Sequence, residues 1–421
     1  MGHYTRVEKS KLRVLLLCQH FYPEMVSTGL HMTELATALT ERDPSLQLKV
    51  LCSNPSKEGF QYSIAGNEVH KGVEIVRFKN FGTEHGSIFS RFLYAASFFI
   101  KSFFYTVKEA PTTDLIIVTT NPPFLGLIPF FVLKFSKIKY ITIIYDIYPD
   151  IAVKLGVFND RSPIVRFWSF ITKLIFNSSA RLVVIGEDMR SIIKEKVNDL
   201  SRIELIHNWS DSRCVFPVTR ENNLFIREHK LESKKVLLYS GNMGRTHNVE
   251  PFLAAAERLQ SREDILFIFI GSGQKRSVIE KTIQDKGLTN IKLLGYQPYE
   301  LLNHVLSCPD LSLVCLEDDF TGYSVPSKTY GILAAGRPVL GILREDSEIA
   351  QTVKKFDCGI VFSSKVDGQL LADSIEGLVK DRQQIERMGQ NGLKAFKENF
   401  ELAISADKYL KLINDVVSSS K

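Results

Sequence analysis

The chain has 421 residues, which is too many for one ordinary hydrophobic core and suits two domains of about two hundred residues each. With 44% hydrophobic and 24% charged residues and only 15 prolines, the composition excludes a disordered, collagen-like or coiled-coil protein. The net charge of +6 is unevenly spread: residues 1–220 hold 27 Lys and Arg against 20 Asp and Glu, whereas residues 221–421 hold 26 against 27. The basic excess therefore belongs to the first half.

Short apolar runs, separated by stretches with helical spacing, follow one another along both halves of the chain. Such alternation predicts parallel, doubly wound sheets. The runs that we expect to form strands in the first half are residues 12–18, 48–52, 73–78, 115–119, 140–145, 182–185 and 203–206. Those of the second half are residues 236–239, 266–270, 291–294, 311–316, 339–343 and 360–362.

A polar stretch at residues 212–235 interrupts this alternation. We therefore expect an α/β protein with two Rossmann-like domains, residues 1–211 and 236–421, joined by a linker, and leave open whether the last helix returns to the first domain. In doubly wound sheets ligands bind outside the carboxyl ends of the strands. The loops after the expected strands, facing a central cleft between the domains, are where we look for chemistry.

Two glycine-containing turns follow expected strands of the second half. The first turn contains Gly241, Asn242, Gly244 and Arg245, and a helical stretch follows it. Free backbone N–H groups, a helix N-terminus and a bidentate arginine together favour phosphate, although a tight turn with a surface arginine explains the segment equally well. The second turn, with Gly273, lacks the third glycine of a dinucleotide-binding loop and is a weak signal.

The most specific segment surrounds Pro326, which suits the first position of a helix. Ser327, Lys328 and Thr329 then fall in the first turn of that helix. A lysine there opposes the helix dipole, so we expect an anion to compensate it; a solvated lysine is the alternative. Together with Arg245, Lys328 suits a diphosphate.

Several short motifs are more specific in their order and spacing than any one of them alone. They are Phe21-Tyr22-Pro23-Glu24, Asn121-Pro122-Pro123, Tyr145-Asp146, His207-Asn208-Trp209, Ser240-Gly241-Asn242-Met243-Gly244, Gly295-Tyr296-Gln297-Pro298, Val325-Pro326-Ser327-Lys328 and Ala334-Ala335-Gly336-Arg337-Pro338. Together, over nearly the whole chain, they resemble family 4 glycosyltransferases of the GT-B fold. The branch that they resemble most contains bacterial N-acetylfucosamine transferase-like enzymes of surface-polysaccharide assembly.

The resemblance implies a retaining, metal-independent enzyme without a cofactor, which moves a sugar from a nucleotide-sugar, most often a UDP-sugar, to a lipid-linked or saccharide acceptor. It also implies that the second domain holds the donor and the first domain the acceptor. By motif, the catalytic diphosphate clamp is formed by Arg245 and Lys328. The implied donor-binding residues are Gly29 in the loop after the first strand, Gly241, Asn242, Gly244, Gly273, Tyr296 in the loop that receives the base, Ser327 and Thr329.

Three positions depart from the family pattern. The lysine that the family usually pairs with the arginine of the first turn is replaced near His247-Asn248, which leaves Lys328 to supply that charge. Gly331 stands where the family usually has a ribose-binding glutamate, and Tyr145 stands where many members have a histidine. We interpret the next residue, Asp146, as the catalytic carboxylate that orients or partly deprotonates the acceptor hydroxyl, with a helix cap before Pro149 as the alternative. A nucleotide-sugar epimerase or hydrolase of the same fold and a non-catalytic GT-B scaffold stay open as other functions.

Two aromatic and basic segments of the first half, residues 89–107 and 165–176, have helical spacing. Either they bind an anionic membrane surface, as a lipid-linked acceptor would require, or they are core helices over the first sheet. The apolar run at residues 115–133 contains Asn121-Pro122-Pro123 and predicts strand, turn and helix, not a membrane span. Residues 1–18 lack a signal sequence, so we expect a cytoplasmic protein, with peripheral binding to the inner face of the membrane left open and no nucleic-acid partner.

Overall fold

The structure is a computed structural model that describes residues 11–24, 27–55, 66–83 and 87–419. Its contacts divide the chain into two compact units, which are described one at a time. Unit 1 comprises Met1–Ile185, Ile192–Ile206 and Ser405–Lys421. Unit 2 comprises Gly186–Ser191 and His207–Ile404.

Two segments near the expected domain boundaries are placed by these contacts. Residues 212–235, expected as a linker, belong to unit 2, where they contain helix α7 (Leu224–His229). The last helix, α15 (Leu402–Ser418), belongs to unit 1 from Ser405 onward. Within unit 1, Arg42 Nε donates to Asp407 Oδ1 of this helix at 2.9 Å.

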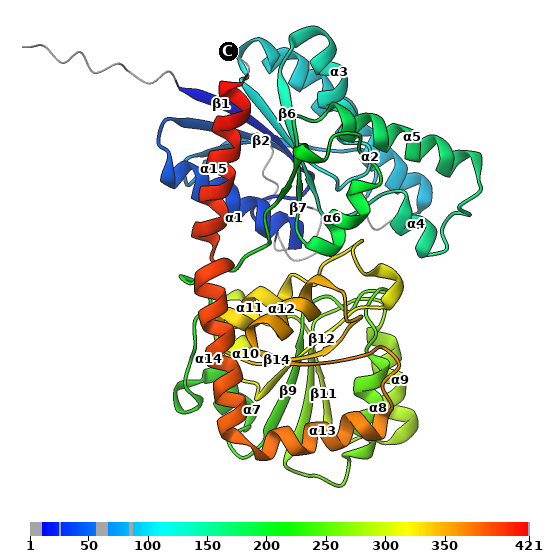
Figure 1. Cartoon of the computed structure of the whole chain (residues 1–421), viewed down its shortest axis with the longest axis vertical. Coiled ribbons are helices and arrows are strands. Elements are labelled where there is room, and N and C mark those ends of the chain that lie inside the picture. The colour runs from blue at the N-terminus through cyan, green and yellow to red at the C-terminus, as the bar shows by residue number, and fades with distance from the viewer. Residues whose placement is uncertain (1–10, 25–26, 56–65, 84–86, 420–421) are drawn as a thin grey trace, which may run out of the picture. The chain divides into compact units, whose positions relative to one another are not determined.

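Unit 1 is built on one eight-stranded sheet (Figure 1). Its strands are β1 (Leu12–Leu17), β2 (Leu46–Ser53), β3 (Asn67–His70), β4 (Val73–Phe78), β5 (Leu115–Thr119), β6 (Lys139–Ile144), β7 (Arg181–Val184) and β8 (Ile203–Leu205). They lie in the order β3-β4-β2-β1-β5-β6-β7-β8. Neighbours are parallel throughout, apart from β3, which pairs antiparallel with β4.

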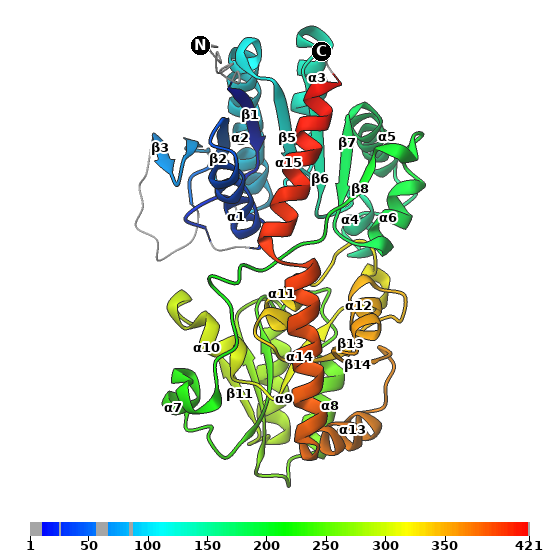
Figure 2. The ribbon, with the colours of Figure 1, turned by 60° about the vertical axis from the view of Figure 1, so that its left-hand side comes forward.

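The helices that begin in unit 1 are α1 (Ser27–Arg42), α2 (Ile88–Glu109), α3 (Leu127–Ser136), α4 (Asp150–Lys154) and α5 (Pro163–Ser178). Helix α6 (Glu187–Lys194), which follows β7, begins in unit 2 and ends in unit 1. Short 3-10 helices precede β5 (Ala110–Thr112) and β8 (Leu200–Arg202). The chain crosses from β4 to β5, β6 and β7 in one direction along the sheet, and from β1 to β2 in the other. Because such crossovers are right-handed, α2, α3 and α5 lie on one face of the sheet and α1 on the other (Figure 2).

Unit 2 has one six-stranded parallel sheet in the order β11-β10-β9-β12-β13-β14. Its strands are β9 (Lys235–Ser240), β10 (Ile265–Ile270), β11 (Ile291–Leu294), β12 (Leu311–Cys315), β13 (Val339–Ile342) and β14 (Gly359–Phe362). Besides α7, its helices are α8 (Glu250–Arg258), α9 (Arg276–Lys286), α10 (Leu302–Ser307), α11 (Lys328–Ala334), α12 (Glu348–Phe356), α13 (Gly368–Lys380) and α14 (Arg382–Asn399), with 3-10 turns at Arg220–Asn222, Tyr299–Leu301 and Asp318–Phe320.

Every strand expected from an apolar run is present, with its ends within two residues of the prediction. Strand β3 was missed because its four residues, Asn-Glu-Val-His, carry no apolar run. It lies at the edge of the sheet and bonds only to β4, so its side chains need no buried face. The run at residues 115–133 forms β5 and part of α3, and none of the helices in the described ranges is long and apolar enough to cross a bilayer.

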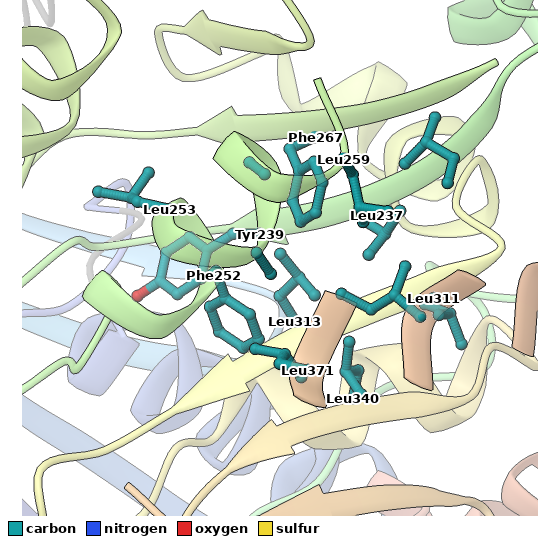
Figure 3. Close-up of a cluster of buried hydrophobic side chains, with 14 of the residues drawn as sticks. Leu237, Tyr239, Phe252, Leu253, Leu259, Phe267, Leu311, Leu313, Leu340 and Leu371 are labelled. Carbon is teal, nitrogen blue, oxygen red and sulfur yellow. The ribbon is translucent and has the colours of Figure 1, made fainter. Parts of the chain in front are cut away.

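The core of unit 2 explains why its strands read as continuous apolar runs. A parallel sheet is covered on both faces, so successive residues of a strand are all buried. The side chains that meet on one face are Leu237, Tyr239, Phe252, Phe267, Leu313, Leu340 and Leu371, each 0% exposed (Figure 3). Full burial of an apolar side chain of this size stabilises the fold by about 1.5–3 kcal/mol.

Neighbouring leucines of α13 provide a matched test of this core. Leu371 is 0% exposed and packs in the cluster, whereas Leu370 is 55% exposed. Leu371→Ala should lower the free energy of unfolding of unit 2 by about 2–5 kcal/mol, because it removes buried methyl groups and leaves a cavity. Leu370→Ala should change it by less than about 0.5 kcal/mol. Urea unfolding followed by circular dichroism measures both, and equal midpoints for the two variants would contradict this packing.

Candidate functional site

The turn after β9 packs directly against the turn after β10. The Met243 N–H donates to the Ser272 carbonyl at 2.7 Å. A Cβ at Gly271 would collide with the Gly241 carbonyl oxygen, and a Cβ at Gly273, where φ is +134°, would lie 2.5 Å from the Met243 oxygen. Glycine at these positions is therefore required by the contact between the two turns, whatever the turns bind.

The first of these turns uses much of its own backbone inside unit 2. The N–H groups of Gly241, Met243 and Gly244 all donate to partners within the unit, that of Gly244 to His247 Nδ1 at 2.9 Å. These three donors are not free for an anion. Arg245 is exposed and has no hydrogen bond or ion pair to any residue that the structure describes. An anion at this turn would therefore be bound by side chains such as that of Arg245 and not by these three backbone N–H groups.

Lys328, the first residue of α11, holds a buried charge without a counterion. Its Nζ is buried, lies 3.5 Å from the centroid of the Tyr239 ring and has no hydrogen-bond partner within the described ranges. Burial lowers the pKa of Lys328 to about 7, because the ammonium has lost its water; the second influence, the Cys315 thiol, acts in the opposite direction. A cation–π contact is favourable by about 0.5–2 kcal/mol and offsets only part of that loss.

Tyr239 and Gly241 set the position of the Lys328 side chain. The Tyr239 hydroxyl donates to the Asn242 carbonyl at 2.8 Å, which fixes the ring under the ammonium. At Gly241, where φ is +123°, an added Cβ would lie 3.6 Å from both Cε and Nζ of Lys328. The ammonium therefore lies against the first glycine turn. That the two form a diphosphate site stays a prediction.

His247 is a further polar group of this turn that the sequence analysis did not assign. Because Nδ1 accepts the Gly244 N–H, the neutral ring carries its proton on Nε2. Burial, and then the charges of Lys328 and Lys275, lower the pKa of His247 to about 3. The ring thus stays neutral at physiological pH and provides one N–H donor. The available signal was that His247 stands near the position of the lysine that the family usually pairs with Arg245.

The other residues expected at the donor site differ in their surroundings. Thr329 is buried and its Oγ1 has no partner among the described residues, while Ser327 is the N-cap residue of α11. Asn242 is exposed, and Tyr296 is 57% exposed in the loop after β11. Partial burial of this side chain raises the pKa of Tyr296. Lys328 lies against Gly241, and the turn that contains Gly241 packs against the turn that contains Gly273.

At Gly331 a packing contact explains the glycine. An added Cβ would lie 3.3 Å from Leu306 Cδ1, which is closer than most Cβ contacts. A glutamate at this position would need Leu306 to shift by a few tenths of an ångström.

Gly29 belongs to unit 1 and lies in the first turn of α1, not in the loop after β1 as expected. Its carbonyl accepts a hydrogen bond from Thr33 Oγ1 at 2.8 Å, and the residue is buried. The helix begins earlier than the sequence suggested, because the residues before Gly29 are already helical.

Asp146 lies in a pocket at the carboxyl ends of β5 and β6. The backbone N–H groups of Tyr145 and Asp146 donate to Thr120 Oγ1 at 3.1 and 3.2 Å, which holds this corner of the chain. The carboxylate itself has no hydrogen-bond partner in the ranges that the structure describes, and burial raises the pKa of Asp146 to about 6. It does not cap α4, whose N-cap is Pro149 without a side-chain hydrogen bond.

Aromatic side chains form one wall of the Asp146 pocket. The Trp168 ring stacks on Phe124 at 4.8 Å and on Tyr148 at 5.7 Å between centroids. Phe124 has a φ of +70°, an unfavourable conformation for a bulky residue that persists only where its surroundings hold it. Gly126 allows the start of α3 to approach α5, since a Cβ there would lie 2.6 Å from Ile175 Cγ2. The sequence analysis singled out Trp168 only as part of a helix, because the stacking partners are distant in sequence.

The described residues contain no group of three or more His, Cys, Asp or Glu side chains that could hold a metal ion. All six cysteines are free thiols in this structure. The metal independence and the lack of a cofactor stay predictions.

Comparison with known proteins gives matches over most of the chain. The family profile described as "Glycosyl transferases group 1" matches residues 221–395. The probable glycosyltransferase WbjE of Pseudomonas aeruginosa is 30% identical over 325 residues, which are 76% of this chain and 80% of that protein. The putative colanic acid biosynthesis glycosyl transferase WcaI of Escherichia coli strain K12 is 23% identical over 417 residues, 96% of this chain and 100% of that protein.

Solved structures show the same fold at low sequence identity. Sucrose-phosphate synthase from Thermosynechococcus elongatus matches with a TM-score of 0.79 and 15% identity over 97% of this chain and 100% of that chain. Anabaena HepE in complex with UDP matches with a TM-score of 0.72 and 12% identity over 96% and 100%. The fold is GT-B, as the resemblance implied. With a curated relative 30% identical over most of both chains, this protein belongs to the group 1 glycosyl transferases and is a glycosyltransferase.

Proposed function

We propose that the protein transfers a sugar, with retention of configuration and without metal or cofactor, from a UDP-sugar to a lipid-linked or saccharide acceptor in surface-polysaccharide assembly. The observation that carries the proposal is the buried, unpaired ammonium of Lys328 beside the glycine turn after β9. Two comparisons support the process and the donor in this proposal. WcaI is named for colanic acid biosynthesis, and structures of HepE contain UDP and UDP-glucose. We place the activity in the cytoplasm, at the inner face of the membrane.

The donor side of the proposal follows from charge. Transfer breaks the bond between the anomeric carbon and the diphosphate, so negative charge develops on the leaving phosphate. An ammonium held in a low-dielectric site stabilises that charge more than a solvated one would. Arg245, which is unpaired among the described residues, adds a second cation with planar, bidentate geometry, and His247 adds a neutral N–H donor. The two cations supply the charge that a metal ion would otherwise supply.

The acceptor side of the proposal rests on the Asp146 pocket. An acceptor hydroxyl that attacks the anomeric carbon gives up its proton. A carboxylate whose pKa is raised to about 6 is ionised at neutral pH and is a better proton acceptor than an ordinary aspartate. The aromatic wall formed by Trp168 and Tyr148 gives a saccharide ring an apolar surface to pack on.

A panel of nucleoside diphosphates and nucleotide-sugars tested by thermal shift identifies the base, because a bound donor stabilises the folded state. UDP and UDP-sugars should give the largest shift. Incubation of a UDP-sugar without an acceptor separates the other functions: epimerised or rapidly hydrolysed donor would favour an epimerase or hydrolase, and no binding of any nucleotide would favour a scaffold.

Replacing Lys328 by alanine tests the diphosphate site. Lys328→Ala should weaken UDP binding by about 1–3 kcal/mol, the usual worth of a hydrogen bond to a charged group. Lys281→Ala, which removes an exposed lysine of α9, should leave the affinity unchanged. Isothermal calorimetry measures both, and undiminished affinity in a folded Lys328→Ala protein removes this lysine from the site.

Binding of UDP should also be linked to protonation of Lys328. In the free protein its pKa is about 7, and a bound diphosphate should raise it toward the ordinary value. At about pH 8 the free lysine is largely neutral, so binding should take up close to one proton; at about pH 6 it should take up almost none. Affinity should accordingly fall as the pH rises above 7. Calorimetry in buffers of different ionisation enthalpy measures the uptake, and Lys328→Ala should abolish it.

Asp146→Asn tests the acceptor site. The variant should depress transfer strongly while UDP affinity stays nearly intact, because Asp146 lies in unit 1. In the parent protein the rate should fall as the pH falls through about 6, where the carboxylate becomes protonated, and the variant should lack this limb. Asp150→Asn is the control, since Asp150 pairs with Lys196 at 2.8 Å and lies outside the pocket lining. A fully active Asp146→Asn protein would falsify the assignment.

A further inference from the structure

Three neighbouring helices of unit 1 expose large apolar side chains to solvent. One such pair on each helix, each member between 46% and 67% exposed, consists of Ile100 and Phe104 on α2, Phe131 and Phe135 on α3, and Phe167 and Phe170 on α5. Within each pair the spacing is three or four residues, so the pair lies on one side of its helix. Soluble monomers rarely expose large apolar residues in such number on adjacent elements unless the surface binds something.

The three helices form a continuous layer on one face of the sheet. Helix α3 contacts both α2 and α5, and all three follow crossovers of the same direction. Each helix also buries a side of its own: Phe98 of α2, Val132 of α3 and Ile175 of α5 are at most 6% exposed. The core-helix expectation for these segments therefore holds on the inward sides of the helices, whereas membrane binding by the outward sides stays a prediction.

The charges of this layer have one sign. The three helices contain six Lys and Arg and a single acidic residue, Glu109, which accepts a hydrogen bond from Lys49 at 2.8 Å. The six cations are Arg91, Lys101, Lys108, Lys134, Arg166 and Lys173. Within the described ranges none of them pairs with a carboxylate. Their positive charge is therefore available to an external anion.

We propose that the exposed side of α2, α3 and α5, the basic aromatic face, binds the surface of an anionic lipid bilayer. Aromatic and aliphatic side chains enter the boundary between headgroups and acyl chains, while Lys and Arg keep their charges at the anionic headgroups. A second copy of the chain fits less well, because joining two such faces would bring two unpaired cationic surfaces together. The charge complementarity selects the anionic bilayer.

The basic aromatic face adjoins the Asp146 pocket through α5 and the start of α3. Trp168 and Thr172 of α5 line the pocket, while Phe167 and Phe170 of the same helix are exposed. Phe124, which precedes α3, lines the pocket and is 39% exposed. The inference rests on the proposed function and narrows its acceptor: a lipid-linked acceptor anchored in the bilayer can present its polar end to Asp146 while its chain stays in the membrane.

Flotation of the full chain with lipid vesicles tests the face. The protein should bind phosphatidylcholine vesicles that contain phosphatidylglycerol at about 0.05 M salt, and binding should weaken at about 0.5 M because salt screens the charges. Vesicles of phosphatidylcholine alone should bind it poorly. Exchange of Arg91, Lys134 and Arg166 for glutamine should weaken the partition on the order of a hundredfold, since each charge near an anionic surface contributes about one factor of five.

A matched triple variant distinguishes this face from general charge. Lys281, Lys394 and Lys397 are exposed lysines of unit 2, and their exchange for glutamine removes the same charge. This control should keep its vesicle binding. An equal loss of binding in both triple variants would overturn the assignment to α2, α3 and α5.

An aromatic triple variant tests the apolar part. Phe104→Ser, Phe131→Ser and Phe167→Ser together should abolish vesicle binding and leave the unfolding midpoint nearly unchanged, because all three side chains are exposed. Phe216→Ser with Leu370→Ser, at exposed positions of unit 2, should keep the binding. Vesicle binding that survives the aromatic triple variant would contradict the proposal, and so would a parent dimer in light scattering that this variant dissociates.

UDP calorimetry on the same samples separates this inference from the proposed function. No vesicle binding under any condition, with UDP affinity intact, overturns the bilayer face and leaves the donor site standing. Vesicle binding together with an unchanged UDP affinity of the Lys328→Ala protein would overturn the donor site and leave the bilayer face standing.

Discussion

The buried charge of Lys328 constrains much of what surrounds it in unit 2. An ammonium without water is costly, and a protein keeps one only where its neighbours hold it in place. Here the Tyr239 ring lies under the charge, its hydroxyl is tied to the Asn242 carbonyl, and Gly241 leaves room for the side chain. The pKa of about 7 expresses the remaining cost, which an anionic ligand would relieve.

The same charge acts on the polar groups beside it. His247 has its pKa lowered partly by Lys328 and stays neutral, so this turn contains a cation and a neutral donor but no competing cationic imidazole. The two glycine turns pack on each other and use their own N–H groups to do so. The backbone of the two turns is therefore held in place by its own hydrogen bonds, while side chains of the first turn are free to bind a ligand. Preorganised stabilisation of a leaving diphosphate requires such an arrangement.

In unit 1, the helices α2, α3 and α5 have two roles: they cover one face of the sheet, and they expose apolar and cationic side chains to solvent. The inward sides of α2, α3 and α5 bury the sheet, and the inner side of α5 also lines the Asp146 pocket with Trp168. Their outward sides keep apolar and cationic side chains in contact with water. Asp146 is raised in pKa because the helices and turns that build the pocket exclude water from it.

Much of the fold could be predicted because a parallel strand buried on both sides must be apolar throughout. This constraint made every strand but β3 visible, and β3 escaped because an edge strand needs no buried face. Lys328 could also be singled out from the sequence, since a lysine at the first residue of a helix opposes the dipole. The sequence also suggested that backbone N–H groups of the glycine turn after β9 bind an anion. Three of these N–H groups already donate to partners within unit 2 and are not free to do so.

The sequence by itself thus determined the alternation of strands and helices, the two sheets and the candidate residues Lys328, Arg245 and Asp146, because those signals are local or periodic. Only the tertiary structure decided that Tyr239 supports Lys328, that His247 is neutral, and that Phe124, Tyr148 and Trp168 form one wall around Asp146. It also decided which aromatic residues of α2 and α5 are buried and which are exposed. These facts depend on contacts between residues far apart in the chain and on the exclusion of water, and neither is encoded in the spacing of neighbouring residues.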